Sequence, residues 1–223
     1  MTLAQMRALV RSPFKWDEND TTATVVADAA LNLHLDRISG MRNWRRLQAT
    51  DVSTTITSST TTSDVPSTMR KLTGVYIINS DGDAREIVPI SWAEQLQNYG
   101  DPSQLTRTTP VNYLFTSAAS GAAGARKQQI VWAPYPDATY TVRYNGIARV
   151  SHLSADADVP WFDEQFHWLL PQFAMGMLAA QEESWDPRNV KALLDIANGG
   201  LADLVMAEPH GLSPTQGIRM PQP

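Results

Sequence analysis

The chain has 223 residues and a mass of 24.6 kDa, enough for one large domain or two small ones around a substantial core. With 43% hydrophobic residues, 18% charged residues and a net charge of -5, the composition excludes a disordered protein and a general nucleic-acid-coating protein. The absence of cysteine excludes disulfide scaffolds, thiol catalysis and cysteine-based zinc sites, and agrees with assembly in a reducing cytoplasm. No secretion signal opens the sequence, and its longest apolar stretch is shorter than the roughly 20 residues of a membrane span, so we expect a soluble protein.

Two helices are predicted near the N-terminus. Thr2 and Gln5 have the spacing of a capping box, and the first helix must end before Pro13. Its apolar stripe consists of Leu3, Met6, Leu9 and Val10. The second helix is expected to begin at Asp20 or Thr21, both good N-caps, and to end near Gly40. Its expected buried face consists of Val26, Ala30, Leu31, Leu33, Leu35 and Ile38.

The middle of the chain reads as β-structure. Ser and Thr dominate residues 50–68, which favours an exposed strand and turn. Asp81-Gly82 between two β-rich runs predicts a hairpin of residues 74–79 and 84–90, followed by a short helix over 91–99 that lies on the sheet. Further strands are predicted at 111–116, 129–132 and 139–144. The Gly, Ala and Ser residues of 117–125 predict a mobile loop.

Two more helices are predicted in the last third of the chain. The first is expected to start at Pro160, with Phe162, Phe166, Leu169, Phe173 and Met177 at helical spacing. Pro171 is expected to kink it. The second starts at Asp186-Pro187 and is weakened by Gly199-Gly200.

These elements define the expected fold class as α+β. We expect a helical bundle formed by the N- and C-terminal helices, with an inserted small β-sheet or barrel-like domain and an extended C-terminal tail. The corresponding segments are residues 1–47 for the N-terminal helices, 48–150 for the β-rich insertion, 151–207 for the C-terminal helices and 208–223 for the tail.

Little in the sequence indicates an enzyme. It contains no phosphate-binding Gly-rich loop followed by Lys, no His-Glu-x-x-His helix and no Gly-x-Ser-x-Gly elbow. The best constellation for a metal or acid-base site consists of His152, Asp156, Asp158, Asp163 and His167. Its irregular spacing matches no ligand geometry, and the favoured interpretation is that its acids are loop and cap residues. We therefore assign no catalytic residue, no cofactor and no metal.

Two features predict contacts with partner proteins. Four aromatic residues lie within two turns of the predicted helix and point in different directions from its axis, so they cannot all face one core: Trp161, Phe162, Phe166 and Trp168. Trp161 and Trp168 are therefore candidate interface residues. The dense basic cluster of Arg42, Arg45 and Arg46 around Trp44 predicts an ion-pairing surface for an acidic partner.

The order of these features resembles the head-to-tail adaptor, or connector, proteins of tailed bacteriophages over nearly the whole chain. The resemblance starts with Leu31-Asn32, Ile38 and Trp44-x-x-Leu47, and continues through Val65-Pro66, Arg70-Lys71-Leu72 and the strand at 140–144. It is closest from Val159-Pro160-Trp161 to Leu170, followed by Ala179, Ala180 and Glu182-Glu183.

The resemblance implies a virion structural protein, not an enzyme, at the head-tail interface, assembled in the host cytoplasm. It implies a ring, a dodecamer, that binds the portal protein above and tail or nozzle proteins below. Double-stranded DNA would pass through its lumen during ejection without specific binding, since an acidic chain repels the duplex. With no long heptad seam, we expect the purified chain to be monomeric until a portal templates the ring.

The tail is the predicted portal contact. An extended chain could place three apolar side chains in successive pockets of a neighbouring protein: Leu212, Ile218 and Met220. Arg219 adds a charge that could orient the segment. Two alternatives stay open: another tail or tail-completion protein, and a glycan-binding or hydrolytic β-domain that uses Trp92, Trp132 and Tyr135.

Overall fold

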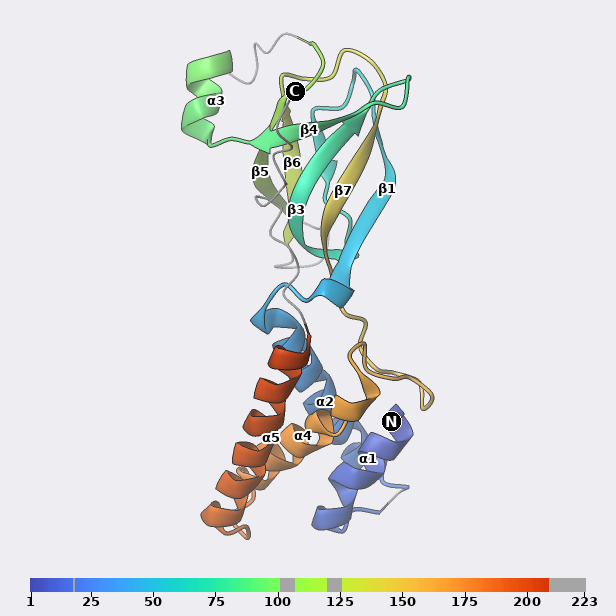
Figure 1. Ribbon diagram of the computed structural model, residues 1–223, viewed down its shortest axis with the longest axis vertical. Coiled ribbons are helices and arrows are strands. Elements are labelled where there is room, and N and C mark those ends of the chain that lie inside the picture. Colours follow the sequence, from blue (N-terminus) through green and yellow to red (C-terminus); the bar gives the residue numbers. More distant parts are fainter. Residues whose placement is uncertain (18, 101–106, 120–125, 209–223) are drawn as a thin grey trace, which may run out of the picture. The chain divides into compact units, whose positions relative to one another are not determined.

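A computed structural model describes residues 1–17, 19–100, 107–119 and 126–208 (Figure 1). The fold is of the mixed α+β class, as predicted. Its residues form two compact units, one from residues 1–47 and 150–208 and the other from residues 48–149. The predicted tail lies outside the described residues, apart from Glu208.

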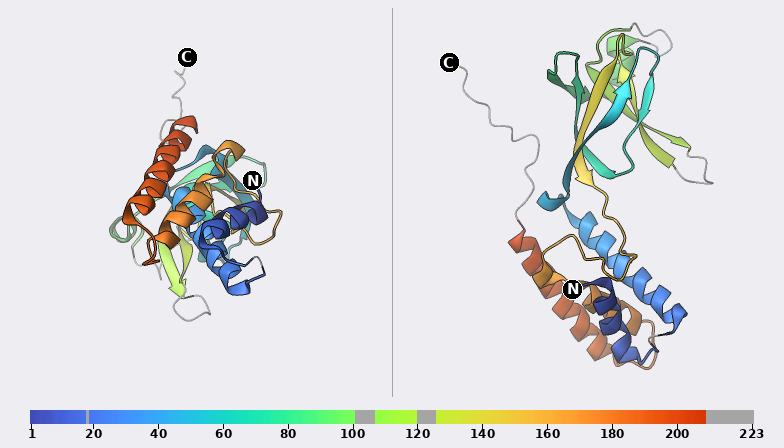
Figure 2. Two further views of the ribbon diagram at one scale, coloured as in Figure 1. Left: turned by 90° about the horizontal axis from the view of Figure 1, so that it is seen from below. Right: turned by 90° about the vertical axis from the view of Figure 1, so that its right-hand side faces the viewer.

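The first unit is helical. Its helices are α1 (Leu3–Arg11), α2 (Thr21–Met41), α4 (Leu169–Ala179) and α5 (Pro187–Ala207). Helix α4 packs against each of the other three, and the views in Figure 2 show the four helices side by side. The apolar composition of α4 explains this central position, because eight of its residues are buried.

The two N-terminal helices begin where the sequence predicts. Thr2 and Gln5 form the capping box of α1, and the carboxylate of Asp20 accepts hydrogen bonds from the first backbone N–H groups of α2. The predicted buried face of α2 is partly wrong. Val26 and Leu33 are exposed, whereas His34 is buried beside Leu35. The helix therefore leaves part of its apolar surface uncovered.

The start of α4 differs from the prediction. Residues 160–168 form an irregular segment with a 3-10 turn at Glu164–Phe166, and the helix begins only at Leu169. Pro171 consequently lies in the first turn, where a backbone N–H has no intrahelical acceptor, so the proline removes no hydrogen bond and the predicted kink does not arise. The apolar spacing predicted too early a helix start because Phe162, although buried, lies in the irregular segment before the helix.

The second unit is a nearly closed seven-stranded sheet in the order β1-β7-β3-β4-β5-β6-β2. Its strands are β1 (Gln48–Ile56), β2 (Thr62–Asp64), β3 (Met69–Ile78), β4 (Ala84–Pro89), β5 (Asn112–Ala119), β6 (Arg126–Ala133) and β7 (Tyr140–Ala148). All neighbours pair antiparallel except β4 and β5, which share a short parallel contact. The predicted β3–β4 hairpin is present.

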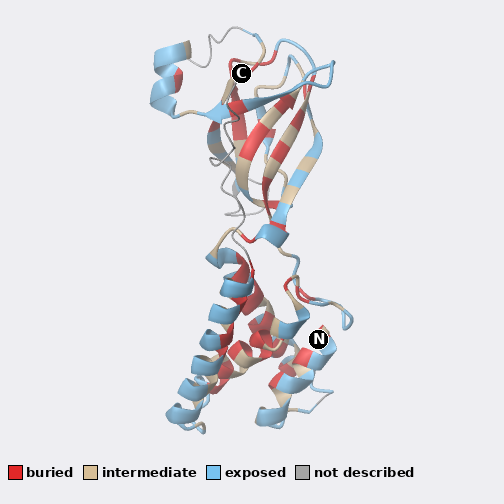
Figure 3. Cartoon of the chain, in the orientation of Figure 1, coloured by how far each residue is buried: buried red, intermediate tan, exposed pale blue. Residues whose placement is uncertain are grey.

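Alternating side chains build the core of the sheet. Tyr140, Val142 and Tyr144 point inward from β7, and Figure 3 shows the corresponding alternation of buried and half-buried positions along this strand. The predicted loop over 117–125 starts too early, because residues 117–119 continue β5 and pair with β6. Backbone hydrogen bonds extend this ladder regardless of the small side chains. Residues 120–125 lie outside the described chain.

Helix α3 (Trp92–Tyr99) is present, but most of it does not lie on the sheet as predicted. Trp92 and Leu96 are exposed, although Gln95 between them is buried. At the end of the helix, the Tyr99 hydroxyl donates to Asn112 Oδ1 on β5 at 2.6 Å. Its N-terminus is fixed by a capping box of Ser91 and Glu94, a local interaction that needs no sheet.

The two glycines in α5 have different environments. A Cβ at Gly200 would lie 2.4 Å from the Trp168 ring, so the glycine allows this ring to contact the helix backbone. A Cβ at Gly199 would meet nothing within 4 Å. The helix-weakening effect predicted for both residues is therefore compensated by packing only at Gly200.

We expect Gly199→Ala to raise the free energy of unfolding by up to about 1 kcal/mol, because alanine is the better helix former. Gly200→Ala should lower it by roughly 1 to 3 kcal/mol, because its methyl group displaces the Trp168 ring. Urea denaturation of the two variants checks this difference, and an equal effect of both would contradict the packing role of Gly200.

Candidate functional site

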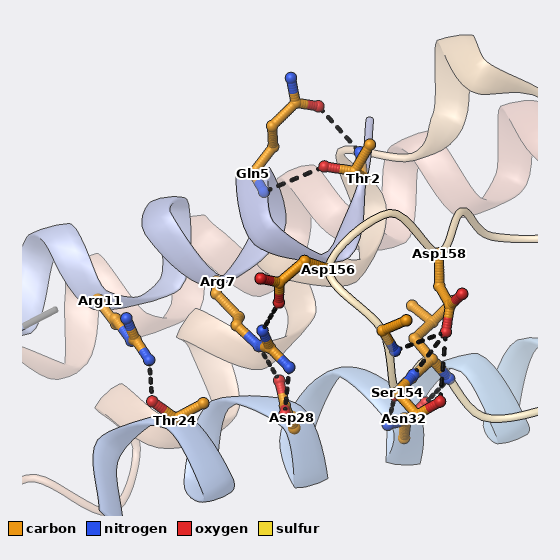
Figure 4. A network of polar contacts seen from close by, with 12 residues as sticks. Thr2, Gln5, Arg7, Arg11, Thr24, Asp28, Asn32, Ser154, Asp156 and Asp158 are labelled. Carbon is orange, nitrogen blue, oxygen red and sulfur yellow. Dashed lines mark hydrogen bonds and ion pairs between the residues drawn. The ribbon is translucent and has the colours of Figure 1, made fainter. Parts of the chain in front are cut away.

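A polar network joins the loop after Val150 to α1 and α2 (Figure 4). Arg7 lies at its centre: Nε and one terminal nitrogen bind the two carboxylate oxygens of Asp28 at 2.5 and 2.7 Å. Its other terminal nitrogen binds Asp156 in the loop. The Asp28 hydrogen bond is the main cause that raises the pKa of Arg7. One guanidinium thus connects three segments of the helical unit.

The loop also satisfies backbone groups that a helix start leaves without partners. The Leu3 N–H donates to the Asp158 carbonyl at 2.8 Å, and the next N–H donates to the Asp156 carbonyl at 3.1 Å. Asn32 on α2 holds the loop from another side. Its Nδ2 donates to the Leu153 carbonyl at 3.0 Å and its Oδ1 accepts from the Leu153 N–H at 2.8 Å.

Asp158 shapes the loop itself. Its carboxylate accepts the backbone N–H groups of Ser154 and Ala155 at 2.7 and 2.8 Å, and these hydrogen bonds lower its pKa. This is the loop-and-cap role favoured from the sequence.

The side chains considered as a metal or acid-base cluster do not gather at one place. Nε2 of His152 lies 2.9 Å from the Asp36 carboxylate, whereas Asp163 pairs with Arg46. His167 is buried and contacts a backbone carbonyl through Nε2 at 2.9 Å. Among the described residues, no three His, Asp or Glu side chains come together as a metal site requires.

An aromatic cluster forms where α2 ends. Trp44 is fully buried, and its Nε1 donates to the Ile38 carbonyl at 2.8 Å. Trp161 packs edge-on against Trp44 with ring centroids 5.3 Å apart, and Phe162 packs against Trp161 at 5.4 Å. The Arg42 guanidinium lies 4.3 Å from the centroid of a Trp44 ring. Trp161, predicted as an interface residue, therefore contacts the inside of its own unit.

The basic cluster around Trp44 binds acidic groups of the same chain. Arg46 pairs with Asp163 and with Glu208, each at 2.7 Å, and the hydrogen bond to Asp163 is the main cause that raises its pKa. Arg42 binds the Glu208 carbonyl. Arg45 is exposed and has no ion-pair partner in the described part of the chain. Arg46 thus finds carboxylates within its own chain, which the sequence pattern did not predict. The contact of this cluster with an acidic partner stays a prediction.

The remaining predicted interface residues divide in two. Trp168 is half-buried with its ring against the α5 backbone at Gly200. The tail residues Leu212, Ile218, Arg219 and Met220 lie outside the described residues. Their role stays a prediction.

The three aromatic residues of the glycan-binding alternative differ in their exposure and do not form one exposed face. Trp132 is fully buried, and its Nε1 donates to the Ser63 hydroxyl at 2.9 Å. Trp92 is exposed on α3, and Tyr135 is partly buried beside β5 and β6. Trp132 therefore belongs to the core of the sheet and presents no stacking face for a sugar.

A groove between α2, α4 and α5 is a feature that the sequence did not reveal. Its volume is about 860 Å³, and Leu33, Phe173, Met177 and Leu194 are among its lining residues. His34 lines it as well, buried and stacked on Phe173 with ring centroids 5.2 Å apart. The only sequence signal was a histidine within the apolar stripe of α2.

Comparison with known proteins agrees with a structural role in a bacteriophage. The family model of the SU10 adaptor protein matches residues 1–210. The chain therefore belongs to the SU10 adaptor protein family, and its resemblance to the phage head-to-tail adaptors is confirmed. No curated protein matches it. None of the helices in the described ranges has the length and apolar character of a membrane-spanning helix.

We expect Trp161→Ala to lower the free energy of unfolding by about 2 to 3 kcal/mol, because it removes the edge-on contact with Trp44. Trp92→Ala is the matched control: this tryptophan is 49% exposed, and its loss should cost less than about 0.5 kcal/mol. Denaturant unfolding measures both variants. If Trp161→Ala keeps the full stability of the wild type, the contact with Trp44 does not stabilise the unit, and the prediction of Trp161 as a residue that contacts a partner protein is favoured.

Burial is the main cause that lowers the pKa of His34, and the nearby Arg37 charge acts in the same direction. Its contribution to stability is therefore fully present above the ordinary pKa of about 6.5 and is lost as the pH falls toward the lower folded pKa. His34→Phe keeps a ring against Phe173 and removes the titration. Unfolding measured between about pH 5 and pH 7.5 should show a weaker acid destabilisation in this variant than in the wild type; parallel curves would contradict the prediction.

Proposed function

We propose that this protein is a head-to-tail adaptor that forms a ring of twelve copies beneath the portal and bridges capsid and tail. The observation that carries the proposal is the family match over residues 1–210. The ring encloses the channel through which double-stranded DNA passes without specific binding. The protein acts by holding its neighbours in place and catalyses no reaction.

The end of α5 supports a role for the last residues in attachment. Glu208 is buried at the C-cap of α5, where Arg42 and Arg46 hold it. The chain therefore leaves the helical unit from a fixed point. Leu212, Ile218 and Met220 follow this point within 12 residues, a reach of roughly 40 Å in extended chain. We propose that this segment docks on the portal, with Arg219 orienting it.

Arg42 and Arg46 bind Glu208 of the same chain, whereas Arg45 is exposed and has no ion-pair partner among the described residues. In the adaptor, Arg45 provides a cation for an acidic group of a portal or tail protein. The cluster thus has two roles: Arg42 and Arg46 fix the start of the tail, and Arg45 contacts the neighbour.

Deletion of residues 209–223 should leave helix content and thermal melting nearly unchanged but abolish co-sedimentation with portal-bearing heads. The cut must follow Glu208, because removing this residue would also break its ion pair with Arg46. A full-length variant with Leu212, Ile218 and Met220 all changed to Ser keeps the length of the chain and tests the apolar contacts. Undiminished co-sedimentation of both variants would refute docking through the tail.

A further inference from the structure

The groove between α2, α4 and α5 combines an apolar lining with two polar side chains that lack a hydrogen-bond or ion-pair partner within the described residues. Leu33 is 54% exposed at this groove, although the groove also contains Met177, Ala180 and Leu194. Exposed apolar surface at a concave site is typical of a contact that is completed by another molecule. Individual exposed leucines need no such explanation, but here the exposed side chain lines a hollow of about 860 Å³.

Two polar side chains at the groove indicate what would complete it. His34 is 5% exposed, and within the described residues its Nε2 has no hydrogen-bond partner. Arg37 is exposed at the same groove, and no carboxylate of the described chain pairs with it. Its neighbour Asp36 is paired with His152. The groove therefore fits an apolar surface that also brings a carboxylate.

Helix α5 carries such a surface on another side. One ridge along the helix consists of residues that follow each other at intervals of four and three: Ala192, Ile196, Gly199, Asp203 and Met206. All five are exposed, Ile196 by 56% and Met206 by 86%. Asp203 has no ion-pair partner among the residues that the structure describes. The ridge thus offers apolar side chains and an unpaired carboxylate together.

The groove and the ridge face different directions. Leu194 lines the groove and Ile196 belongs to the ridge. Residues two apart in an α-helix point to nearly opposite sides, because one turn takes 3.6 residues. One copy therefore cannot put its own ridge into its own groove. Two unlike faces on opposite sides of a helix are what a head-to-tail contact needs. Repetition of such a contact closes a ring when the rotation from copy to copy adds up to a full turn.

We propose that the groove of each copy binds the α5 ridge of the next copy in the ring. Ile196 of the second copy enters the groove beside Leu33, and Asp203 of the second copy pairs with Arg37. Charge favours this occupant: Arg37 at the groove and Asp203 on the ridge are both exposed, carry opposite charges, and have no ion-pair partner among the residues that the structure describes. The inference rests on the proposed ring, but it assigns the surfaces that meet.

Cysteine crosslinking tests the contact directly, because the natural chain contains no cysteine. Full-length protein carrying Leu33→Cys and Ile196→Cys is bound to portal-bearing heads, oxidised and separated under non-reducing conditions. We expect a ladder of dimers, trimers and larger products, since each copy contributes one residue to each of two contacts. Both single-cysteine variants and the pair Val88→Cys with Ile196→Cys, which uses an equally exposed residue of the sheet unit, are the controls.

The outcomes separate the inference from the proposed function. If the protein sediments with heads but yields no ladder, or products that stop at the dimer, the groove-ridge contact is wrong while the adaptor role stands. If it does not sediment with heads, the adaptor role fails. The same oxidation of the unbound protein at about 1 mM then decides the contact, a ladder supporting it and its absence overturning it.

Charge reversal gives an independent test of the ion pair. Arg37→Glu and Asp203→Arg should each weaken ring formation on portal-bearing heads several-fold, and the double variant should recover most of this loss. Both side chains are exposed, so neither change should alter the melting temperature by more than a few degrees. A double variant no better than the single ones would overturn the pairing of Arg37 with Asp203.

Discussion

The helical unit depends on the return of the chain, after about 100 residues of sheet, to the helices with which it began. The loop after Val150 makes this return specific. It accepts the first N–H groups of α1, binds Arg7 through Asp156, and is held by Asn32 through both polar groups of the Leu153 backbone. The contacts to the backbone groups of the buried Leu3 and Leu153 matter most, because these groups would otherwise lie in the interior without a partner.

A second set of contacts fixes the C-terminal ends of α2 and α5. Trp44 fills the space beyond α2, and Arg46 links this region to Asp163 and to Glu208 at the end of α5. The place from which the C-terminal residues leave is therefore determined by packing and charge, not by the last helical turn alone. A structural protein that attaches through its tail benefits from such a fixed origin, because less conformational freedom is lost on binding.

The same helices leave two surfaces unfilled, the groove beside Leu33 and the ridge through Ile196. Both arise from the sequences of α2 and α5, whose apolar residues exceed what the contacts with α4 cover. An isolated unit gains nothing from this surplus and is exposed to nonspecific association. In a ring it is consistent with a protein whose final packing partner is another copy of itself.

The sequence alone determined the class of the fold, most strands and most helix starts, because caps, turns and alternation are local signals that act within a few residues. Thr2, Asp20, Ser91 and Asp186 each start a helix as predicted, and Asp81-Gly82 closes the expected hairpin. The sequence pattern also led to the adaptor family.

Only the tertiary structure decided which apolar and charged residues are used internally. Trp161 contacts Trp44, Arg46 meets Glu208, Pro171 falls in a first turn and Gly200 makes room for Trp168, and each partner lies far away along the chain or depends on where a helix begins. Spacing along one helix shows which residues share a face, but burial depends on what another segment brings to that face. The groove could not be predicted for the same reason, since three helices from both ends of the chain form it.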